Sequence, residues 1–414
     1  MTVSKIMTKF ETPKTADVSS VVDWLIEGAP GAPLSQDILL HLVRRLLSCG
    51  LPLHRAAVFV TTLHPNVMGR AFYWHEAKPD IEVGEAPYAI LDSEEYKQSP
   101  VVKVIENGIE IHRPLFKSDC PNDFEMLQGF VEEGITDYII LPLKFTSGEV
   151  HAVSWSTCAE EGFSEQHLSF LRKICPALSR LAEIMALKRV SINLLDAYLG
   201  HQSGEKVLSG KIKRGDGEDI LAVIWFCDLR GSTILADTLP REEYMNLLND
   251  YFECMAGAIL DCGGEVLKYI GDAVLGIFPI DRNSKNYNQT CTLSVNAARE
   301  AMSRMEKLNQ ERATQGNPEL HYGIGLHLGE VMYGNIGTSE RIEFGVVGAA
   351  VNETSRIEGM TKLLEKNILV SGEVARHLDE EWHSLGQHSL RGVDEKIELF
   401  IPPSALKSPK KLSV

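Results

Sequence analysis

Two aspartates stand where the surrounding sequence could hold divalent cations against a phosphate. Asp228 follows residues 220–227 (ILAVIWFC), a β-branched and aromatic run typical of a strand buried on both faces, which we expect Asp228 to end. Asp272 lies in the Gly271-Asp272 turn of a predicted β-hairpin over residues 264–278. Such a pair can bracket two Mg²⁺ ions that bridge the attacking and leaving oxygens in phosphoryl chemistry. Taken singly, each aspartate is more often only a turn former.

A short stretch of small residues follows the first aspartate. The turn Gly231-Ser232-Thr233 precedes a predicted helix over residues 242–259. Backbone N–H groups and a helix N-terminus would therefore point toward whatever Asp228 holds. A triphosphate fits such a position.

The C-terminal part of the chain resembles the catalytic domain of class III nucleotidyl (adenylate/guanylate) cyclases. Four segments carry the resemblance, in the family's order: FCDLRGST (226–233), GGEVLKYIGDAVLGIF (263–278), GIGLHLGEVMYGNIG (323–337) and FGVVGAAVNETSRIEG (344–359). A series of this kind is far more specific than a single Gly-Asp dipeptide. The resemblance implies a ferredoxin-like α/β palm whose active sites form between two catalytic domains. Because the sequence contains one such domain, a homodimer with two equivalent sites is implied.

The resemblance also implies which residues each of the two chains contributes to one active site. One chain would bind two Mg²⁺ (or Mn²⁺) ions through Asp228, Asp272 and the carbonyl of Leu229. The reaction implied is the conversion of ATP to 3′,5′-cyclic AMP and pyrophosphate, an adenylate cyclase (lyase) activity.

The other chain would supply three residues to the same site. Lys268 matches the residue that reads the purine, Asn352 the one that orients the ribose, and Arg356 the one that stabilises the transition state. Without the four segments, Asn352 and Arg356 would be read as a solvated helix pair at i and i+4.

The choice of base depends on two positions. The ammonium of Lys268 favours adenine, whose N1 accepts a hydrogen bond, over guanine, whose N1–H donates one. The partner position, usually Asp or Thr in adenylyl cyclases of the family, aligns with Gly345, which has no side chain. A backbone carbonyl, a water or Glu343 could substitute, or the selectivity could be relaxed. Arg391 lies where members of the family have a cationic residue that contacts the triphosphate. The alternative interpretation, an ordinary surface arginine, explains the residue nearly as well.

Three other functions compete with the adenylate cyclase. A guanylate or mixed-specificity cyclase stays open because of Gly345. A catalytically silent nucleotide-binding regulator is disfavoured because all five key positions are filled. A diguanylate cyclase ranks low, since residues 263–266 read GGEV and not the GGDEF pattern of that class.

The N-terminal block has an α+β pattern. A helix capped by Ser35 is expected to run to Gly50, followed by strands at 56–63, 71–74, 138–145 and 150–156. The hairpin at 142–157 and the helix start at 163–171 resemble a GAF-type sensory domain; the alternative is an α+β domain that serves only dimer contact. Its histidines at 54, 64, 75 and 112 have no metal-ligand spacing.

A long helix is predicted from its cap at Ser164 toward Arg189, with Pro176 inside it. Its apolar positions 168, 171, 175, 178, 182 and 185 suit either a two-stranded coiled coil or packing on the domain's own sheet. The glycine-rich segment after it resembles the transducer element that precedes many class III catalytic domains. The predicted order is a tail (1–18), a GAF-like domain (19–189), a linker or transducer (190–219), the catalytic domain (220–402) and a tail (403–414).

The charge and composition of the chain limit the classes of partner that we expect it to bind. The chain has 414 residues and a formal net charge of −16, which disfavours nucleic acid and anionic membranes. Its eight cysteines include no Cys-x-x-Cys pair and read as reduced. No segment has the length and apolarity of a membrane span, so we expect a cytoplasmic protein whose partners are ATP, a second copy and an unknown signal at the N-terminal domain.

Overall fold

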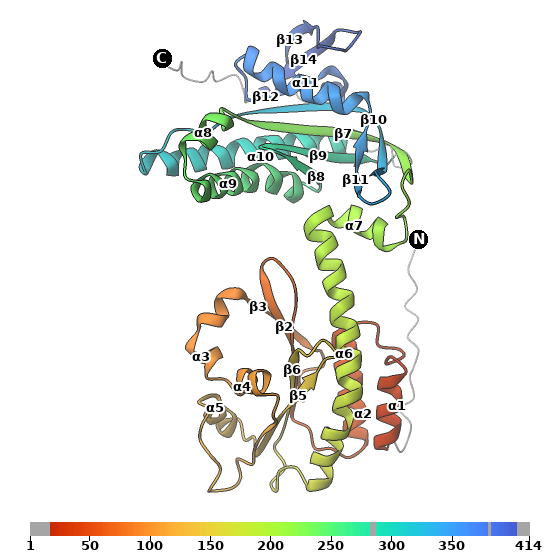
Figure 1. The fold of residues 1–414 in the computed structure, drawn as a ribbon, viewed down its shortest axis with the longest axis vertical. Coiled ribbons are helices and arrows are strands. Elements are labelled where there is room, and N and C mark those ends of the chain that lie inside the picture. The colour runs from red at the N-terminus through yellow and green to blue at the C-terminus, as the bar shows by residue number, and fades with distance from the viewer. Residues whose placement is uncertain (1–16, 282–286, 380–381, 404–414) are drawn as a thin grey trace. The chain divides into compact units, whose positions relative to one another are not determined.

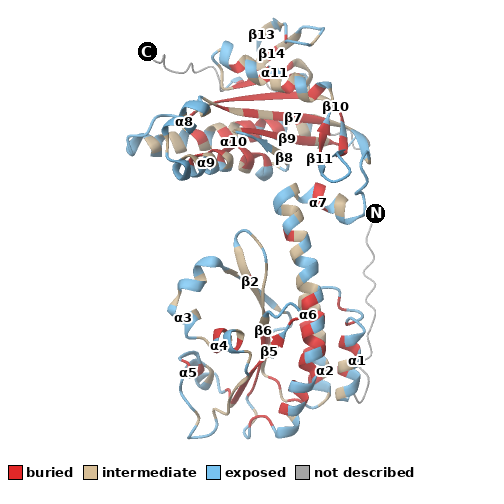
Figure 2. Cartoon of the chain, viewed as in Figure 1, coloured by how far each residue is buried: buried red, intermediate tan, exposed pale blue. Residues whose placement is uncertain are grey.

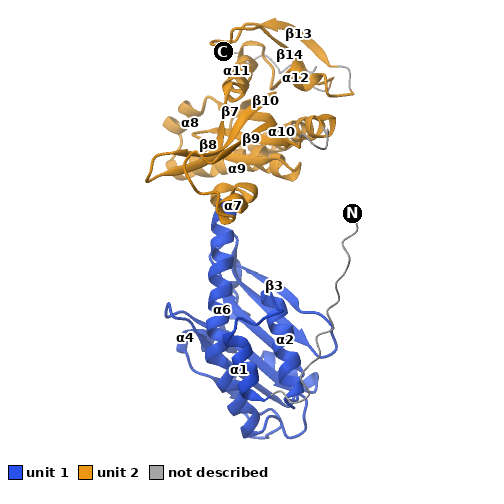
Figure 3. Ribbon diagram, turned by 90° about the vertical axis from the view of Figure 1, so that its right-hand side faces the viewer, with its two compact units in different colours: residues 1–197 blue, residues 198–414 orange. Residues whose placement is uncertain are grey.

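The computed structural model describes residues 17–281, 287–379 and 382–403, and it divides into two compact units, residues 1–197 and 198–414 (Figures 1 and 3). Most of both predicted tails lies outside the described residues. Of the N-terminal one, Val18 already begins the first helix, whose N-cap Asp17 accepts a hydrogen bond from the backbone of Ser20.

Unit 1 is an antiparallel sheet between two layers of helices. The strand order is β3-β2-β1-β6-β5-β4. The strands are β1 (Arg55–Thr61), β2 (Val67–His75), β3 (Glu82–Pro87), β4 (Ile111–Arg113), β5 (Asp137–Lys144) and β6 (Val150–Thr157). The helices are α1 (Val18–Ile26), α2 (Ser35–Ser48), the 3-10 turn η1 (Tyr88–Asp92), α3 (Glu94–Lys97), α4 (Pro100–Asn107), α5 (Met126–Glu132) and α6 (Glu165–Leu199). The four predicted strands and both predicted helices of this unit are therefore confirmed.

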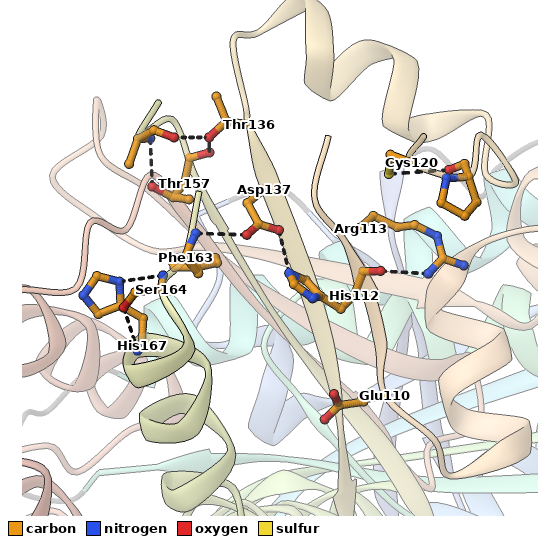
Figure 4. A network of polar contacts seen from close by, with 12 residues as sticks. Glu110, His112, Arg113, Cys120, Thr136, Asp137, Thr157, Phe163, Ser164 and His167 are labelled. Atoms are coloured by element: carbon orange, nitrogen blue, oxygen red, sulfur yellow. Dashed lines mark hydrogen bonds and ion pairs between the residues drawn. The ribbon is translucent and has the colours of Figure 1, made fainter. Parts of the chain in front are cut away.

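The main core of unit 1 lies under α1, α2 and α6, and a smaller one lies under α4 and α5 on the other face of the sheet (Figure 2). Asp137, at the start of β5, ties the sheet to the segment that enters α6. Its buried carboxylate accepts from the Phe163 N–H at 2.9 Å and contacts Nε2 of His112 at 2.8 Å (Figure 4). His112 therefore serves a structural contact.

Two expected helix ends need correction. Ser35 is the first residue of α2 and not its cap; Leu34 occupies that position and offers no side-chain bond. The cap of α6 is confirmed, because Oγ of Ser164 accepts from the His167 N–H at 3.2 Å. That helix continues past Arg189 to Leu199, so the segment predicted as linker holds the end of a long helix, then α7 (His201–Leu208) and the start of β7.

The structure decides between the two readings of α6. Leu168, Leu171, Cys175 and Leu178 are all buried within unit 1, in the same core as the sheet. The heptad spacing at these positions therefore reflects packing on the unit's own sheet and not a coiled-coil seam.

Unit 2 contains a sheet in the order β13-β14-β12-β10-β7-β9-β8, with β11 paired to β10. Its strands are β7 (Gly217–Arg230), β8 (Glu265–Ile270), β9 (Ala273–Ile280), β10 (His321–Gly337), β11 (Ile342–Val347), β12 (Ile368–Ser371), β13 (His383–His388) and β14 (Ile397–Ile401). Its remaining helices are α8 (Ser232–Thr238), α9 (Arg241–Asp261), α10 (Tyr287–Thr314), α11 (Ala349–Leu363) and α12 (Gly372–Ala375).

The central part of this sheet is a β-α-β-β-α-β unit. The strands β7, β8, β9 and β10 take the spatial order β10-β7-β9-β8 with antiparallel neighbours, which is the ferredoxin-like arrangement. Helices α9 and α10 cover one face, and α11 packs against β10 and β7 on the other (Figure 1). The side chains of β7 alternate accordingly: Trp225 and Cys227 enter the core under α9 and α10, whereas Ala222 and Ile224 face the opposite side.

Candidate active site

The two predicted metal-binding aspartates come together at one end of the sheet. Asp228 belongs to β7, and Asp272 lies in the turn between β8 and β9, next to the register pair Cys227–Val274. Burial, then the charge of Asp272 and a hydrogen bond between the two carboxyl groups, raise the pKa of Asp228 to about 6. One carboxylate oxygen of Asp272, Oδ2, is buried and has no hydrogen-bond partner among the described residues. Two carboxyl groups that repel each other and leave a buried oxygen unsatisfied fit a cation.

The expectation that Asp228 ends its strand is wrong. The strand continues to Arg230 because β10 pairs with β7 over its whole length, from Gly334–Gly217 to His321–Arg230. The chain turns only at Gly231, whose φ of 74° is left-handed, and the short helix α8 begins at Ser232. The predicted turn residues Gly231, Ser232 and Thr233 therefore lie at the start of α8, which has no side-chain cap.

The residues present fit a magnesium ion better than a zinc site. No group of three or more His, Cys, Asp or Glu side chains suitable for a metal is found in the described parts of the chain. Magnesium is usually held by one or two carboxylates together with substrate phosphates and waters. Asp228, Asp272 and the adjacent carbonyl of Leu229 supply a donor set of that kind.

A third carboxyl group, which the sequence did not single out, faces this pair. A Cβ added to Gly323 would lie 2.3 Å from Oε1 of Glu358, and Gly323 is paired with Asp228 across the ladder. Burial, and next the charge of Asp228, raise the pKa of Glu358 to about 7. The glycines at 323 and 325 are the available sequence signal, since a side chain at Gly325 would meet the backbone of α11 at 2.7 Å. They let α11 approach the sheet closely enough to bring Glu358 over it.

The base-reading candidates lie on neighbouring strands. Nζ of Lys268 on β8 donates to Oε1 of Glu343 on β11 at 2.7 Å. Gly345, two residues along β11, is buried and pairs with Gly334 of β10. A Cβ built on Gly345 would meet no other atom within 4 Å, so the backbone leaves room for a side chain there.

The three remaining candidates are not brought to the aspartates within the described chain. Asn352 and Arg356 are exposed, one turn apart on α11, and Arg391 is exposed in the turn after β13. None of them makes a hydrogen bond or ion pair with another described residue. Arg356 and Glu358 are two positions apart, about 200° around a helix, so Arg356 points away from the aspartates that Glu358 approaches.

A buried polar network joins α7 to the same region of unit 2, and it was not expected from the sequence. The Ser203 hydroxyl and the Tyr333 hydroxyl both donate to the carboxylate of Glu265 on β8, at 2.6 and 2.8 Å. All three side chains are buried. Glu265 lies three residues before Lys268 on one strand, so this network positions the strand that carries the base-reading candidate.

Comparisons with known proteins identify the C-terminal domain. Residues 219–402 match the model of the adenylate and guanylate cyclase catalytic domain. These residues are therefore a class III cyclase catalytic domain, as the four segments predicted. The family includes both adenylate and guanylate cyclases.

Individual relatives cover the same part of the chain. An adenylate cyclase of Anabaena cylindrica is 39% identical over 186 residues, 43% of this chain and 36% of the relative. An uncharacterised protein of Mycobacterium tuberculosis is 31% identical over 224 residues, 53% of this chain and 39% of the relative. The chain thus spans less than two fifths of the length of these curated relatives.

Solved structures with similarity to the chain include cyclases of both kinds. The adenylyl cyclase CyaB from P. aeruginosa is 25% identical, with a TM-score of 0.42, over 48% of this chain and 100% of that one. The guanylyl cyclase Cya2 is 29% identical, with a TM-score of 0.40, over 46% of this chain and 98% of that one.

Proposed function

We propose that the protein is an adenylate cyclase that converts ATP to 3′,5′-cyclic AMP and pyrophosphate at sites formed between two copies of the chain. The observation that carries the proposal is the pairing of Asp228 with Asp272, with an unsatisfied buried oxygen, in a class III cyclase catalytic domain. Adenylate cyclase activity in the Anabaena relative supports the same reaction.

Mg²⁺ held by Asp228, Asp272 and the Leu229 carbonyl would supply Lewis-acid chemistry toward the ribose 3′-hydroxyl and the phosphates. The chain's own residues do the rest. From the second copy, Lys268 donates to N1 of adenine, and Asn352 orients the ribose by hydrogen bonding. Arg356 neutralises charge that develops at the α-phosphate, a preorganised contribution worth several kcal/mol of barrier. At the start of α8, backbone N–H groups near Ser232 and Thr233 face the triphosphate.

The positions of these groups support a site shared by two copies. Arg356 and Asn352 are exposed and unpaired among the described residues, on the side of α11 away from the aspartates of their own chain. Apolar side chains near Lys268 are also exposed: Tyr269 by 53%, Ile270 by 48% and Ile342, next to the Glu343 that Lys268 contacts, by 41%. Solvent-exposed apolar groups gathered around a candidate site mark an interaction surface, and a second copy would cover them.

A guanylate or mixed-specificity cyclase is the second candidate. Lys268 favours ATP, but its ammonium is held by Glu343 at 2.7 Å and Gly345 offers no side chain to the exocyclic amine. Glu343 is thus near enough to take part in base recognition.

We further propose that unit 1 is a GAF-like regulatory domain acting through α6 and α7. Its antiparallel six-stranded sheet with helices on both faces supports the proposal. A cytoplasmic location is proposed because the substrate is ATP and all eight cysteines are free. No helix in the described parts of the chain is long and apolar enough to span a membrane.

The test is product formation by the purified full chain with ATP or GTP and Mg²⁺ or Mn²⁺. We expect cyclic AMP and pyrophosphate in equal amounts, and loss of both in Asp272→Ala. Asp250→Ala, an exposed aspartate of α9, is the matched control and should keep wild-type activity. No product from either nucleotide in a folded dimer would indicate either an absent activator of unit 1 or a nucleotide-binding regulator, and nucleotide-binding calorimetry would then separate the two.

Mixing two inactive variants tests whether the site is shared. Asp272→Ala and Arg356→Ala remove groups that belong to different chains of one site. A heterodimer of the two retains one intact site, so co-expression should restore roughly a quarter of wild-type activity by random pairing. No recovery despite heterodimer formation would show that both residues act within a single chain.

A further inference from the structure

Unit 1 contains a cavity of about 350 Å³ between α2, α6 and strands β1 and β2. This volume lies within the range of roughly 300–1,000 Å³ usual for small-molecule sites. Its floor is apolar and nearly closed off from solvent, with Leu39 3% exposed, Val58 8% and Leu181 5%. Such a floor suits a hydrocarbon group.

The lining of the cavity carries positive charge. Arg70, Lys188 and Arg189 contribute to its lining, and no aspartate or glutamate does. Arg70 is paired with Glu85 at 2.5 Å, whereas Lys188 and Arg189 are exposed and form no ion pair with a described residue. Two unpaired cations beside an apolar floor are notable in a chain with a net charge of −16.

The first turn of α2 also lines the cavity and adds no net positive charge to it. Ser35 and Gln36 line the cavity, and Leu34 gives the helix no side-chain cap. Asp37 in this turn accepts a hydrogen bond from the Leu34 N–H at 3.2 Å, so a carboxylate already faces the positive end of this helix. The ionic contacts of a ligand therefore fall to Lys188 and Arg189.

We propose that this cavity binds a single-chain amphiphile with one anionic end, of the class of long-chain monocarboxylates. The hydrocarbon chain would lie on the floor formed by Leu39, Val58 and Leu181, and the carboxylate would meet Lys188 and Arg189. Binding is independent of the proposed cyclase activity; only its consequence for activity rests on that proposal.

A second copy of the chain fits the cavity less well. The apolar side chains of α6 best placed for a helix from another copy are Ile184 and Leu187, each 61% exposed, and neither lines the cavity. The cavity residues of α6, including Leu181, Met185 and Ile192, form a separate stripe at helical spacing. The concave face therefore suits a small molecule, and a protein partner would use the other face.

The cavity also offers a route for regulation, because α6 forms one wall. The same helix continues without interruption from Glu165 to Leu199, and its C-terminal end leads into α7 of the catalytic unit. A ligand that packs on Leu181 and Met185 would fix this wall of the cavity. We therefore expect the rate of cyclic AMP formation to differ between the ligand-bound and the ligand-free protein.

Isothermal titration of the full chain with dodecanoate, below its micelle-forming concentration and without nucleotide, tests the binding. Dodecanol and dodecylammonium are the matched probes with no charge and with the opposite charge. We expect dodecanoate to bind with 1:1 stoichiometry, at least tenfold more tightly than dodecanol, and dodecylammonium not to bind. Equal binding of the three probes, or no binding of dodecanoate, overturns the proposal.

Variants separate the apolar and ionic parts of the site. Ala186→Phe fills the cavity and should abolish binding, whereas Ala186→Ser at the same position should preserve it. The double substitution Lys188→Gln with Arg189→Gln should weaken dodecanoate at least tenfold and leave dodecanol unchanged. Lys173→Gln, an exposed cation elsewhere on α6, is the charge control and should have no effect.

Sedimentation equilibrium of the same variants distinguishes a small-molecule site from an interface between copies. We expect Ala186→Phe to leave the oligomeric state unchanged. Dissociation of the assembly by this substitution would overturn the proposal and assign the face to a second copy. Because these measurements use no nucleotide, they stand even if the chain proves to have no cyclase activity.

Discussion

The hydroxyl of Ser203 on α7 donates a 2.6 Å hydrogen bond to the carboxylate of Glu265 on β8, and both side chains are buried. The backbone N–H of Ser203 donates to the same oxygen at 3.1 Å. The Tyr333 hydroxyl donates to that carboxylate as well, and Nζ of Lys206 lies 4.1 Å from the centre of the Tyr333 ring. Hydrogen bonds to a buried charge are strong and costly to break. This network therefore anchors the segment before the catalytic domain to the strand of Lys268.

Ser203→Ala should destabilise the catalytic unit by about 1.5–3 kcal/mol, the usual worth of a hydrogen bond to a charged group. The loss arises because Glu265 stays buried with one donor fewer. Denaturant unfolding of the full chain, followed by a signal specific to the catalytic unit, measures it.

Ser209→Ala is the matched control for this change. Ser209 lies at the end of α7 and its hydroxyl donates to the exposed carbonyl of Lys206 at 2.8 Å. We expect less than about 0.5 kcal/mol for this variant. Equal effects of the two substitutions would show that the buried network has no special role.

Gly345→Thr should raise the preference for ATP over GTP by about tenfold, the value of one hydrogen bond of ordinary strength. The substitution is sterically open, since the added Cβ meets no atom within 4 Å, and the hydroxyl could accept from the exocyclic amine of adenine. The ratio of kcat/KM for the two nucleotides measures the effect. Gly345→Val adds a side chain of similar shape that lacks the hydroxyl. If this variant raises the preference for ATP by the same factor, the hydrogen bond to the hydroxyl is not the cause.

We expect that changing the nucleotide preference from ATP to GTP requires two substitutions. Lys268→Glu alone would place two carboxylates together, because Glu343 now contacts the Lys268 ammonium at 2.7 Å. We expect this single variant to lose activity with ATP and to gain little with GTP. The double variant Lys268→Glu with Glu343→Gln removes the repulsion and should turn the preference toward GTP. Initial rates with both nucleotides decide, and a full conversion by Lys268→Glu alone would show that Glu343 takes no part.

The parts of the catalytic unit that could be predicted from the sequence depend on short-range patterns. The buried run before Asp228 and the Gly-Asp turn at 271–272 define a strand and a hairpin, and pairing of β7 with β9 then brings Asp228 and Asp272 together. The extension of β7 to Arg230 could not be predicted locally, because the long partner strand β10 determines it. In unit 1, four strands were predictable for the same reason, but β3 and β4 were not predicted. The end of α6 was misplaced by ten residues because no breaker follows Arg189 until Gly200.

Contacts between residues far apart in the chain escaped prediction. Ser203 and Glu265 are 62 positions apart, and neither belongs to a motif that suggests the other. Glu358 lies two residues after Arg356, but its closeness to Asp228 depends on how near α11 packs over Gly323 and Gly325. Such proximity is a property of the packed unit and not of any single segment.

Glu358 gives the catalytic unit a distinctive pH dependence in the absence of divalent cations. Burial and the charges of Asp228 and Asp272 raise its pKa to about 7, while Arg230 and a contact with Thr361 oppose the rise. In the unfolded chain a glutamate titrates near about 4.3, so between these values the folded state holds a proton that the unfolded state has released. Folding stability therefore decreases as the pH increases from about 4.3 through 7.

Glu358→Gln removes this titration and should stabilise the metal-free protein at pH 8 by about 1–3 kcal/mol, with little change at pH 4. The reason is that the amide carries no charge to bury beside Asp228. Urea unfolding in EDTA at several pH values measures the difference. Glu365→Gln, at an exposed position just after the end of the same helix, reports the effect of an amide substitution as such. A stability gain that is independent of pH, or a loss at pH 8, would show that the Glu358 carboxyl is held by favourable contacts and not strained by its neighbours.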